Sequence, residues 1–296
     1  MRVVIAGSSG LIGTALVPHL RGAGHDVVRL VRRAPQAPDE RGWDPPAGHV
    51  EPGALDGVDA VINLCGVGIA DKRWTGAYKQ ELRDSRMVPT DTLARAVAAE
   101  GVPVLINGSA VGWYGDTGSV AVDESSTSGG GLLADLCRDW ENATRPAHEA
   151  GARVVTVRTG LVLSQAGGLM GQMKPLFSVG LGGRLASGKQ YQPWISLDDE
   201  VGAIRHALEH DAVAGPLNAT GPVPVTNAEF TRVLAEQMRR PAMLPVPAFA
   251  LRIALGEFAD EGVLVSQRVL PAVLERSGYS FRHATVGAAL AAVLES

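Results

Sequence analysis

Three glycines close to the start of the chain have the spacing of a phosphate-binding turn. The apolar residues 2–6 predict a strand, and Gly7, Gly10 and Gly13 follow it where a helix must begin. Gly7 allows a sharp turn, Gly10 lets backbone N–H groups approach a phosphate, and Gly13 lets the helix pack closely on the strand. The pattern predicts a site for the pyrophosphate of a dinucleotide; the alternative is a glycine-rich turn in an unrelated α/β domain. The expected contacts are Gly7, Ser9, Gly10, Leu11, Ile12 and Gly13.

The charges after the second predicted strand indicate which dinucleotide binds. Residues 26–31 have the pattern of that strand, and Arg32 and Arg33 follow it. Sites for NAD place an acid here to hold the ribose 2′-hydroxyl, whereas guanidinium groups attract a 2′-phosphate. We therefore expect NADP to be bound by Arg32 and Arg33. The alternative is a pair of solvated arginines at a strand end.

A third predicted strand ends in small and polar residues. Residues 59–66 form an apolar run that closes with Asn63, Leu64, Cys65 and Gly66. In open parallel sheets, ligands collect at the carboxyl ends of the strands. These four residues are therefore expected to lie beside the cofactor.

Candidate chemistry follows the strand predicted over residues 102–107. Ser109 carries a hydroxyl that would face the nicotinamide and bond a substrate carbonyl or alcohol. Tyr114 would donate a proton if its pKa were lowered, and Trp113 would form a wall of the substrate pocket. The structural alternative is that Ser109 closes a turn and both aromatic side chains pack in the interior.

Motifs occur along essentially the whole chain: the glycine loop, Arg32 and residues 63–66, 85–86, 109–115, 136–141, 158–163, 182–184, 193–195, 244–247 and 267–271. Together they resemble the atypical extended short-chain dehydrogenase/reductases of the NAD(P)-dependent, sugar-nucleotide epimerase-like family. The resemblance implies an α/β fold, a Rossmann-type doubly wound parallel sheet with a smaller C-terminal α/β substrate lobe. It also implies Arg86 as a further cofactor contact. Fold likeness does not define a reaction.

One usual part of that family's machinery is missing from the sequence. Extended members carry Tyr-x-x-x-Lys on a helix, where the lysine lowers the tyrosine pKa for proton transfer. Alignment through Glu141 puts Leu133 at the tyrosine position and Cys137 at the lysine position. We therefore expect no standard proton relay, and we expect Cys137 to pack.

Two further groups of polar residues have structural and functional interpretations. The resemblance places Gln192 and Trp194 at the rim of the substrate site, while Ser196 and Asp199 have the spacing of a helix capping box. His206 and His210 share one helix face but have no third ligand at metal-site spacing. They are expected to form a solvated face, and no metal site is predicted.

Composition favours an ordinary enzyme-sized globular body. Of 296 residues, 46% are apolar and 20% are charged, so a large core can form. A net charge of −4 gives no electrostatic reason to expect nucleic acid or an anionic membrane as partner. No apolar run reaches the ~18 residues of a membrane span. Cys65 and Cys137 are far apart, which predicts free thiols and a cytoplasmic protein.

The expected organisation is a dinucleotide-binding domain over residues 1–160 and a substrate-binding lobe over residues 161–296. A strand near residues 216–220 returns to complete the first sheet. Residues 34–57 form a connection outside the core, with a short strand expected near residues 49–51. Helices are predicted over residues 75–100 and 227–238. By analogy with related folds, the helices from Thr75 and from Leu132 would form a homodimer face.

The sequence thus predicts an NADP(H)-dependent oxidoreductase or epimerase that acts on a small carbonyl or alcohol. Ser109, with Tyr114 or a water molecule, would supply the proton or the oxyanion contact. The alternative is a catalytically silent NADP-binding protein that senses redox state or supports a partner. The missing Tyr-x-x-x-Lys pair favours this alternative, whereas the hydroxyl and phenol after residue 107 favour the enzyme.

Overall fold

The computed structural model describes residues 1–242 and 244–295, which form two compact units of three segments each. The first unit comprises Met1–Ser109, Leu136–Val157 and Val201–Leu217, and the second comprises Ala110–Asp135, Arg158–Glu200 and Asn218–Ser296. The chain therefore passes between the units several times. The boundary expected at residue 160 lies near one of these passages, but residues 110–135 belong to the second unit and residues 201–217 to the first.

An eight-stranded, mostly parallel sheet runs through the fold in the order β12-β8-β6-β5-β1-β2-β3-β4. The strands are β1 (Arg2–Ala6), β2 (Asp26–Val31), β3 (Glu40–Asp44), β4 (His49–Val50), β5 (Ala60–Asn63), β6 (Val104–Ala110), β8 (Arg153–Thr159) and β12 (Gly215–Ala219). β1 pairs in parallel with both β2 and β5. Because the order reverses on the two sides of β1, the carboxyl ends of β1 and β5 form a topological switch point. The predicted doubly wound fold is confirmed, as is the returning strand near residue 216.

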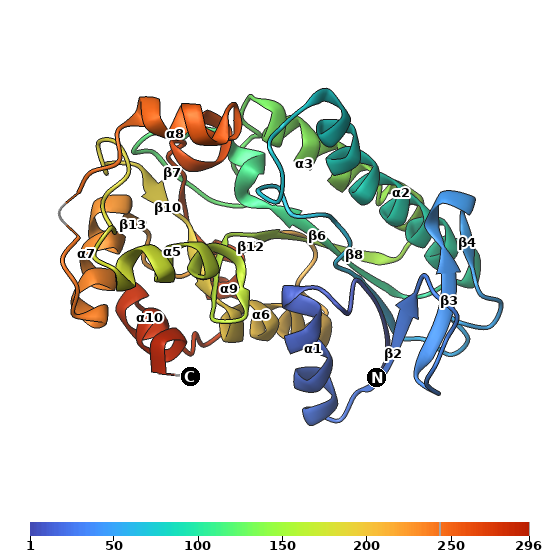
Figure 1. Ribbon diagram of the computed structural model, residues 1–296. Coiled ribbons are helices and arrows are strands. Elements are labelled where there is room, and N and C mark those ends of the chain that lie inside the picture. Colours follow the sequence, from blue (N-terminus) through green and yellow to red (C-terminus); the bar gives the residue numbers. More distant parts are fainter. Residues whose placement is uncertain (243, 296) are drawn as a thin grey trace. The chain divides into compact units, whose positions relative to one another are not determined.

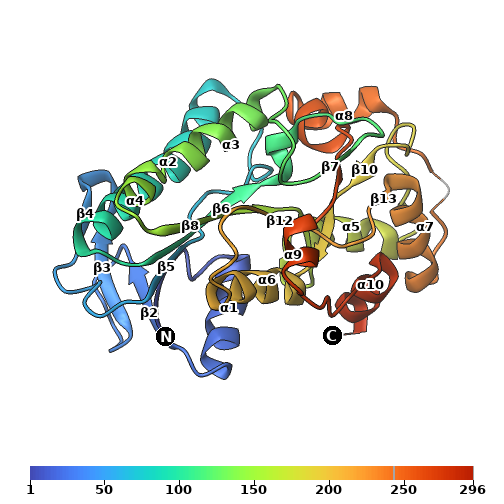
Figure 2. The same ribbon diagram turned by 180° about the vertical axis from the view of Figure 1, so that it is seen from behind.

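Helices cover both faces of the sheet (Figures 1 and 2). They are α1 (Leu11–Gly22), α2 (Gly76–Glu100), α3 (Leu132–Asn142), α4 (Arg145–Glu149) and α6 (Leu197–Glu209). Within the first unit, α2, α4 and the end of α3 lie on one face, and α1 and α6 lie on the other. The long helix begins as predicted, because the Thr75 hydroxyl accepts a hydrogen bond from the N–H of Tyr78.

The segment over residues 34–57 contributes two strands to the sheet, so the prediction that it lies outside the core is wrong, whereas the short strand expected near residues 49–51 is present as β4. β3 pairs in parallel with β2, and β4 pairs with β3 in antiparallel orientation. The short helix η1 (Pro45–Ala47) joins them, and Trp43 is buried in the core. The prediction failed because β3 contains one large apolar side chain among polar residues and has no apolar alternation.

The second unit is built from short strands and helices around its own apolar cluster. The strands are β7 (Ala121–Val122), β9 (Leu161–Ser164), β10 (Tyr191–Gln192), β11 (Trp194–Ser196), β13 (Val225–Thr226) and β14 (Arg268–Val269). The helices are η2 (Val111–Tyr114), α5 (Gly168–Ser178), α7 (Asn227–Met238), α8 (Ala248–Leu255), η3 (Ala259–Val263), α9 (Ala272–Arg276) and α10 (Val286–Glu295). Trp194, Phe230 and Leu290 are buried together in the cluster. Within residues 1–242 and 244–295, no helix is both long and apolar enough to cross a membrane.

Candidate functional site

The glycine loop has the geometry that its sequence predicts. Gly7 has φ +79°, and a Cβ added there would lie 2.7 Å from the carbonyl carbon of Leu64. A Cβ at Gly13 would lie 2.7 Å from the Cα of Ser8. At Gly10, by contrast, a Cβ would meet one atom, the carbonyl oxygen of Gly7, at 3.4 Å. Packing therefore requires Gly7 and Gly13, whereas Gly10 leaves open space above an exposed turn.

Helix α1 begins at this open space with its backbone donors uncapped. Gly10 is the N-cap, no side chain caps the helix, and no acid lies in the first turn. The first N–H groups of a helix have no acceptor within the helix, and the helix dipole favours an anion there. Ser9 is exposed, and Leu11 and Ile12 are half-buried. The uncapped helix start and the free space at Gly10 are compatible with the predicted pyrophosphate site.

The two arginines after β2 have different surroundings. Arg33 donates to both carboxylate oxygens of Glu40, at 2.8 Å and 2.7 Å. Arg32 is exposed, and no acceptor for its guanidinium occurs in the part of the chain that the structure describes. Burial raises the pKa of the Cys65 thiol to about 12, and the charge of Arg32 acts in the opposite direction. Arg32 therefore lies near the end of β5, while Arg33 is committed to Glu40.

At the end of β5, Asn63 is a buried structural amide. Its Nδ2 donates to Asn107 Oδ1 at 2.7 Å and to Thr90 Oγ1 at 2.9 Å, and its Oδ1 accepts from the N–H of Cys65 at 3.1 Å. These bonds fix the segment of Leu64, Cys65 and Gly66 as it leaves the sheet. The raised pKa of Cys65 keeps its thiol neutral and unreactive.

Arg86 holds the same segment from α2. Its guanidinium donates to the carbonyl of Val67 at 2.9 Å and to that of Leu82 at 3.0 Å, and it lies 5.1 Å from the ring centre of Trp140. Burial lowers the pKa of Arg86. The structure thus shows Arg86 bound to backbone, and its predicted cofactor contact remains a prediction.

Ser109 has a carboxylate partner that the sequence reading did not name as functional. Its hydroxyl donates to Glu141 Oε1 at 2.7 Å, and Ser109 is buried. Glu141 lies on α3, the helix that also carries Cys137, and Cys137 is buried as expected. The signal for Glu141 was its place on the helix that lacks the Tyr-x-x-x-Lys pair.

In the second unit, Tyr114 belongs to a buried polar network. Its hydroxyl donates to Asn218 Oδ1 at 2.7 Å and accepts from Arg158 Nη1 at 2.9 Å. The Arg158 guanidinium lies 3.9 Å from the ring centre of Trp113. Burial raises the pKa of Tyr114 to about 12, although Arg158 acts to lower it. The lowered pKa on which its proton-donor role was predicated is therefore not found.

Neither Arg158 nor Asn218 was predicted to carry function. β8 contains two arginines, Arg153 at its start and Arg158 near its end; Arg158 was the available signal, because a buried charge requires polar partners. Asn218 is fixed from its backbone, since its N–H donates to Glu124 Oε1 at 3.0 Å. Burial raises the pKa of Glu124.

Several buried polar atoms of this unit have no hydrogen-bond partner among the residues that the structure describes. They include Trp113 Nε1, Glu124 Oε2, Gln192 Oε1 and Thr220 Oγ1. Such atoms are rare in folded proteins and commonly await a water molecule or a ligand. Gln192 therefore stays a candidate for substrate binding, together with Trp113.

Trp194 requires a correction. It is 1% exposed, it packs in the apolar cluster, and its Nε1 donates to the carbonyl of Val223 at 3.0 Å. The predicted position of Trp194 at the rim of a substrate site is wrong. The prediction failed because the sequence does not show whether a tryptophan near a strand end faces a site or the apolar core.

The capping box of α6 is present, since Ser196 Oγ accepts from the N–H of Asp199 at 3.1 Å and donates to its carboxylate at 2.7 Å.

On the same helix His206 is buried, so the predicted solvated face is wrong for this residue. Its ring stacks on that of His210, with the two ring centroids 3.8 Å apart. Burial lowers the pKa of His206.

Glu200, also on α6, is fully buried. Its Oε1 accepts from the hydroxyl of Thr159 at 2.7 Å, and its Oε2 has no partner in the described part of the chain. Burial raises its pKa to about 8.

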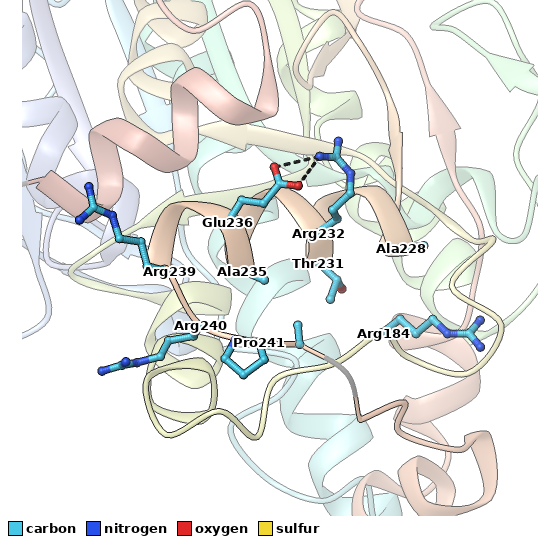
Figure 3. A pocket seen from close by; sticks show the side chains of 10 residues that line it. Arg184, Ala228, Thr231, Arg232, Ala235, Glu236, Arg239, Arg240 and Pro241 are labelled. Carbon is cyan, nitrogen blue, oxygen red and sulfur yellow. Dashed lines mark hydrogen bonds and ion pairs between the residues drawn. The ribbon is translucent and has the colours of Figure 1, made fainter.

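A cavity of about 520 Å³ lies along α7, but its charged side chains are not arranged around a common ligand position. Arg232 at its edge is paired with Glu236, and the guanidinium groups of Arg184, Arg239 and Arg240 point in different directions (Figure 3). Among the described residues that line this cavity, no charged groups converge on a common point.

A doubly wound sheet, a glycine turn at its switch point and an uncapped helix start define a Rossmann-type dinucleotide-binding protein. Comparison with known proteins agrees. The model of the NAD dependent epimerase/dehydratase family matches residues 3–132, and a domain of unknown function, DUF1731, matches residues 246–293.

Whole-chain relatives extend the agreement. The epimerase family protein Mb2239 of Mycobacterium bovis is 58% identical over 288 residues, which cover 97% of this chain and 96% of that protein. The crystal structure of human epimerase family protein SDR39U1 (isoform 2) with NADPH is 33% identical with a TM-score of 0.92, covering 100% of this chain and 99% of that one. A nucleoside-diphosphate sugar epimerase from Corynebacterium glutamicum is 38% identical with a TM-score of 0.83, covering 99% of this chain and 58% of that one. The chain belongs to the epimerase family, as the resemblance predicted.

Proposed function

We propose that this protein binds NADPH at the glycine loop and acts as an oxidoreductase or epimerase on a small carbonyl or alcohol. The observation that carries the cofactor assignment is the open, uncapped start of α1 at Gly10, with the unpaired guanidinium of Arg32 near the adjoining strand end. The NADPH in the human relative's crystal structure supports the choice of NADP over NAD.

Each part of the cofactor has candidate residues in the first unit. The turn from Gly7 to Gly13 would hold the pyrophosphate through backbone N–H groups, and Arg32 would hold the 2′-phosphate. Leu64, Cys65 and Gly66 would contact the adjoining ribose. The bound nicotinamide would supply hydride chemistry.

For the proton, we propose Ser109 together with Glu141. The Ser109 hydroxyl donates to Glu141 Oε1 at 2.7 Å, so this carboxylate is placed to hold a proton released from Ser109 Oγ or to return it. Tyr114, with its pKa raised to about 12, would remain neutral and serve as a hydrogen-bonding group.

The test is NADPH oxidation against a panel of aldehydes, ketones, quinones and sugar nucleotides. Ser109→Ala is expected to lower turnover by roughly 10²-fold, the size typical of a lost acid–base group. Glu141→Gln should give a comparable loss with a changed pH profile, and Tyr114→Phe a smaller one. Cys137→Ala is the control on the same helix and should change turnover little. A severe loss in Cys137→Ala with Ser109→Ala unaffected would contradict the assignment.

The second candidate is a catalytically silent NADPH-binding protein. It is favoured by Leu133 and Cys137, both buried, in place of the usual tyrosine and lysine. Tight NADPH binding without turnover of any compound in the panel would decide for it. In either case we propose a cytoplasmic protein that handles a small molecule and forms a homodimer through the helices that begin near Thr75 and Leu132.

A further inference from the structure

The segment that follows β2 is fixed by a buried carboxylate. The side chain of Glu40 is 2% exposed, and it accepts both Arg33 bonds and the N–H of Gln36 at 2.8 Å. Arg29 adds an ion pair with Glu40 at 3.1 Å. All donors to this carboxylate come from β2 or from the few residues after it.

These contacts account for the charge of Arg33. A bidentate guanidinium–carboxylate pair is a strong and geometrically specific interaction. Both terminal nitrogens of Arg33 donate hydrogen bonds to Glu40, and Nη1 also donates to the carbonyl of Ala34 at 3.0 Å. A 2′-phosphate could bind Arg33 only by breaking this pair, which would leave the buried carboxylate of Glu40 without its main partner.

Arg32 is in the opposite situation. It is exposed, its charge reaches Cys65 at the end of β5, and no carboxylate in the described ranges 1–242 and 244–295 neutralises it. Of the two adjacent guanidinium groups, this one keeps its donors for a ligand.

We infer that Glu40, through Arg33, positions the segment that carries Arg32, the residue proposed above to hold the 2′-phosphate, and that Arg33 itself does not contact this phosphate. This inference rests on the proposed NADPH site and assigns its selectivity. According to this inference, Arg33 also neutralises the negative charge of Glu40. Without Arg33, that carboxylate would repel a 2′-phosphate but would not repel a 2′-hydroxyl.

The test is calorimetric titration of the full-length chain with NADPH, NADH and 2′,5′-ADP. Arg32→Met should weaken NADPH and 2′,5′-ADP by at least about tenfold and leave NADH unchanged, as expected for a lost hydrogen bond to a charged group. Arg33→Met should also lower the NADPH-to-NADH affinity ratio. Arg33→Met/Glu40→Gln should restore most of that ratio, because a neutral amide replaces the carboxylate that has lost its bidentate partner.

Arg41→Met is the matched control. Arg41 is a neighbouring arginine on β3 whose guanidinium donates to the carbonyls of Pro38 and Glu40, and its loss should leave the ratio unchanged. If the double variant is as impaired as Arg33→Met, Arg33 contacts the phosphate directly and the inference is overturned. An unchanged ratio in Arg32→Met overturns it as well. Failure of the unmodified protein to bind any of the three nucleotides would instead reject the proposed function itself.

Discussion

At the scale of single residues, the glycine loop separates packing from binding. Backbone atoms occupy the space next to Gly7 and Gly13, whereas Gly10 has φ −77° and an almost empty side-chain position. Any residue can adopt the backbone of Gly10. The fold therefore gives no reason for a glycine at this position, which supports the proposed pyrophosphate site there.

This contrast gives a prediction for substitutions in the loop. Gly10→Val should keep the far-ultraviolet circular dichroism and the melting temperature of the parent while weakening NADPH by about 100-fold or more, or about 2.7 kcal/mol. Gly13→Val should lower stability, because its side chain would overlap the backbone of Ser8. Gly10→Ala, with a single added carbon, serves as the control and should fall between. Unaltered NADPH affinity in Gly10→Val would show that the loop is structural only.

Predictions about single positions could be made from the sequence where the type of residue alone determines its structural role. The spacing of the glycines was informative because backbone atoms leave no space for a side chain at Gly7 and Gly13. The role of Arg32 stays a prediction. The sequence alone was not sufficient where the role of a side chain depends on its contacts with other parts of the fold. Trp194 resembles a ligand-binding residue until the apolar cluster is placed around it, and the pair of Arg33 with Glu40 could not be predicted from the position of Arg33 in the sequence.

At the scale of elements, α2 was predictable from apolar residues at helical spacing, such as Leu82 and Leu93, and α7 from the cap at Thr226. α2 begins after Thr75 and α7 after Thr226, and each threonine hydroxyl accepts a hydrogen bond from the third residue beyond it. β3 was not predictable from its own residues. Its place in the sheet depends on pairing with β2 and on the ion pair between Glu40 and Arg33, and both involve residues outside the strand.

The cap of α7 yields a prediction about stability. The Thr226 hydroxyl accepts from the N–H of Glu229 at 3.3 Å, and this helix packs Phe230 and Leu234 into the core of the second unit. Thr226→Ala should lower the free energy of unfolding by about 1 kcal/mol, the usual cost of a lost N-cap. Thr226→Ser keeps the hydroxyl and should remain close to the parent in urea titration. Equal loss in both variants would mean that the methyl group of Thr226, and not its hydroxyl, stabilises the helix.

At the scale of the whole molecule, stability is shaped by carboxyl groups that respond to pH in opposite directions. The guanidinium groups of Arg33 and Arg29 and the N–H of Gln36 lower the pKa of Glu40 to about 2. Its contribution to stability is therefore present above its unfolded pKa of about 4.3 and is lost as the pH falls toward 2. Burial raises the pKa of Glu200 to about 8, so its effect runs the other way.

The last prediction concerns this buried glutamate. Between about pH 4.3 and pH 8 the unfolded chain ionises at Glu200 while the folded chain keeps the proton, so stability falls as the pH rises through this window. Glu200→Gln keeps the shape and the acceptor for Thr159 but cannot ionise. Its melting temperature should therefore exceed that of the parent at pH 8, with the difference shrinking toward pH 5. Thermal unfolding of both proteins from pH 5 to pH 9 measures this difference. Parallel curves for the two proteins across that range would show that Glu200 titrates normally and that its surroundings admit water.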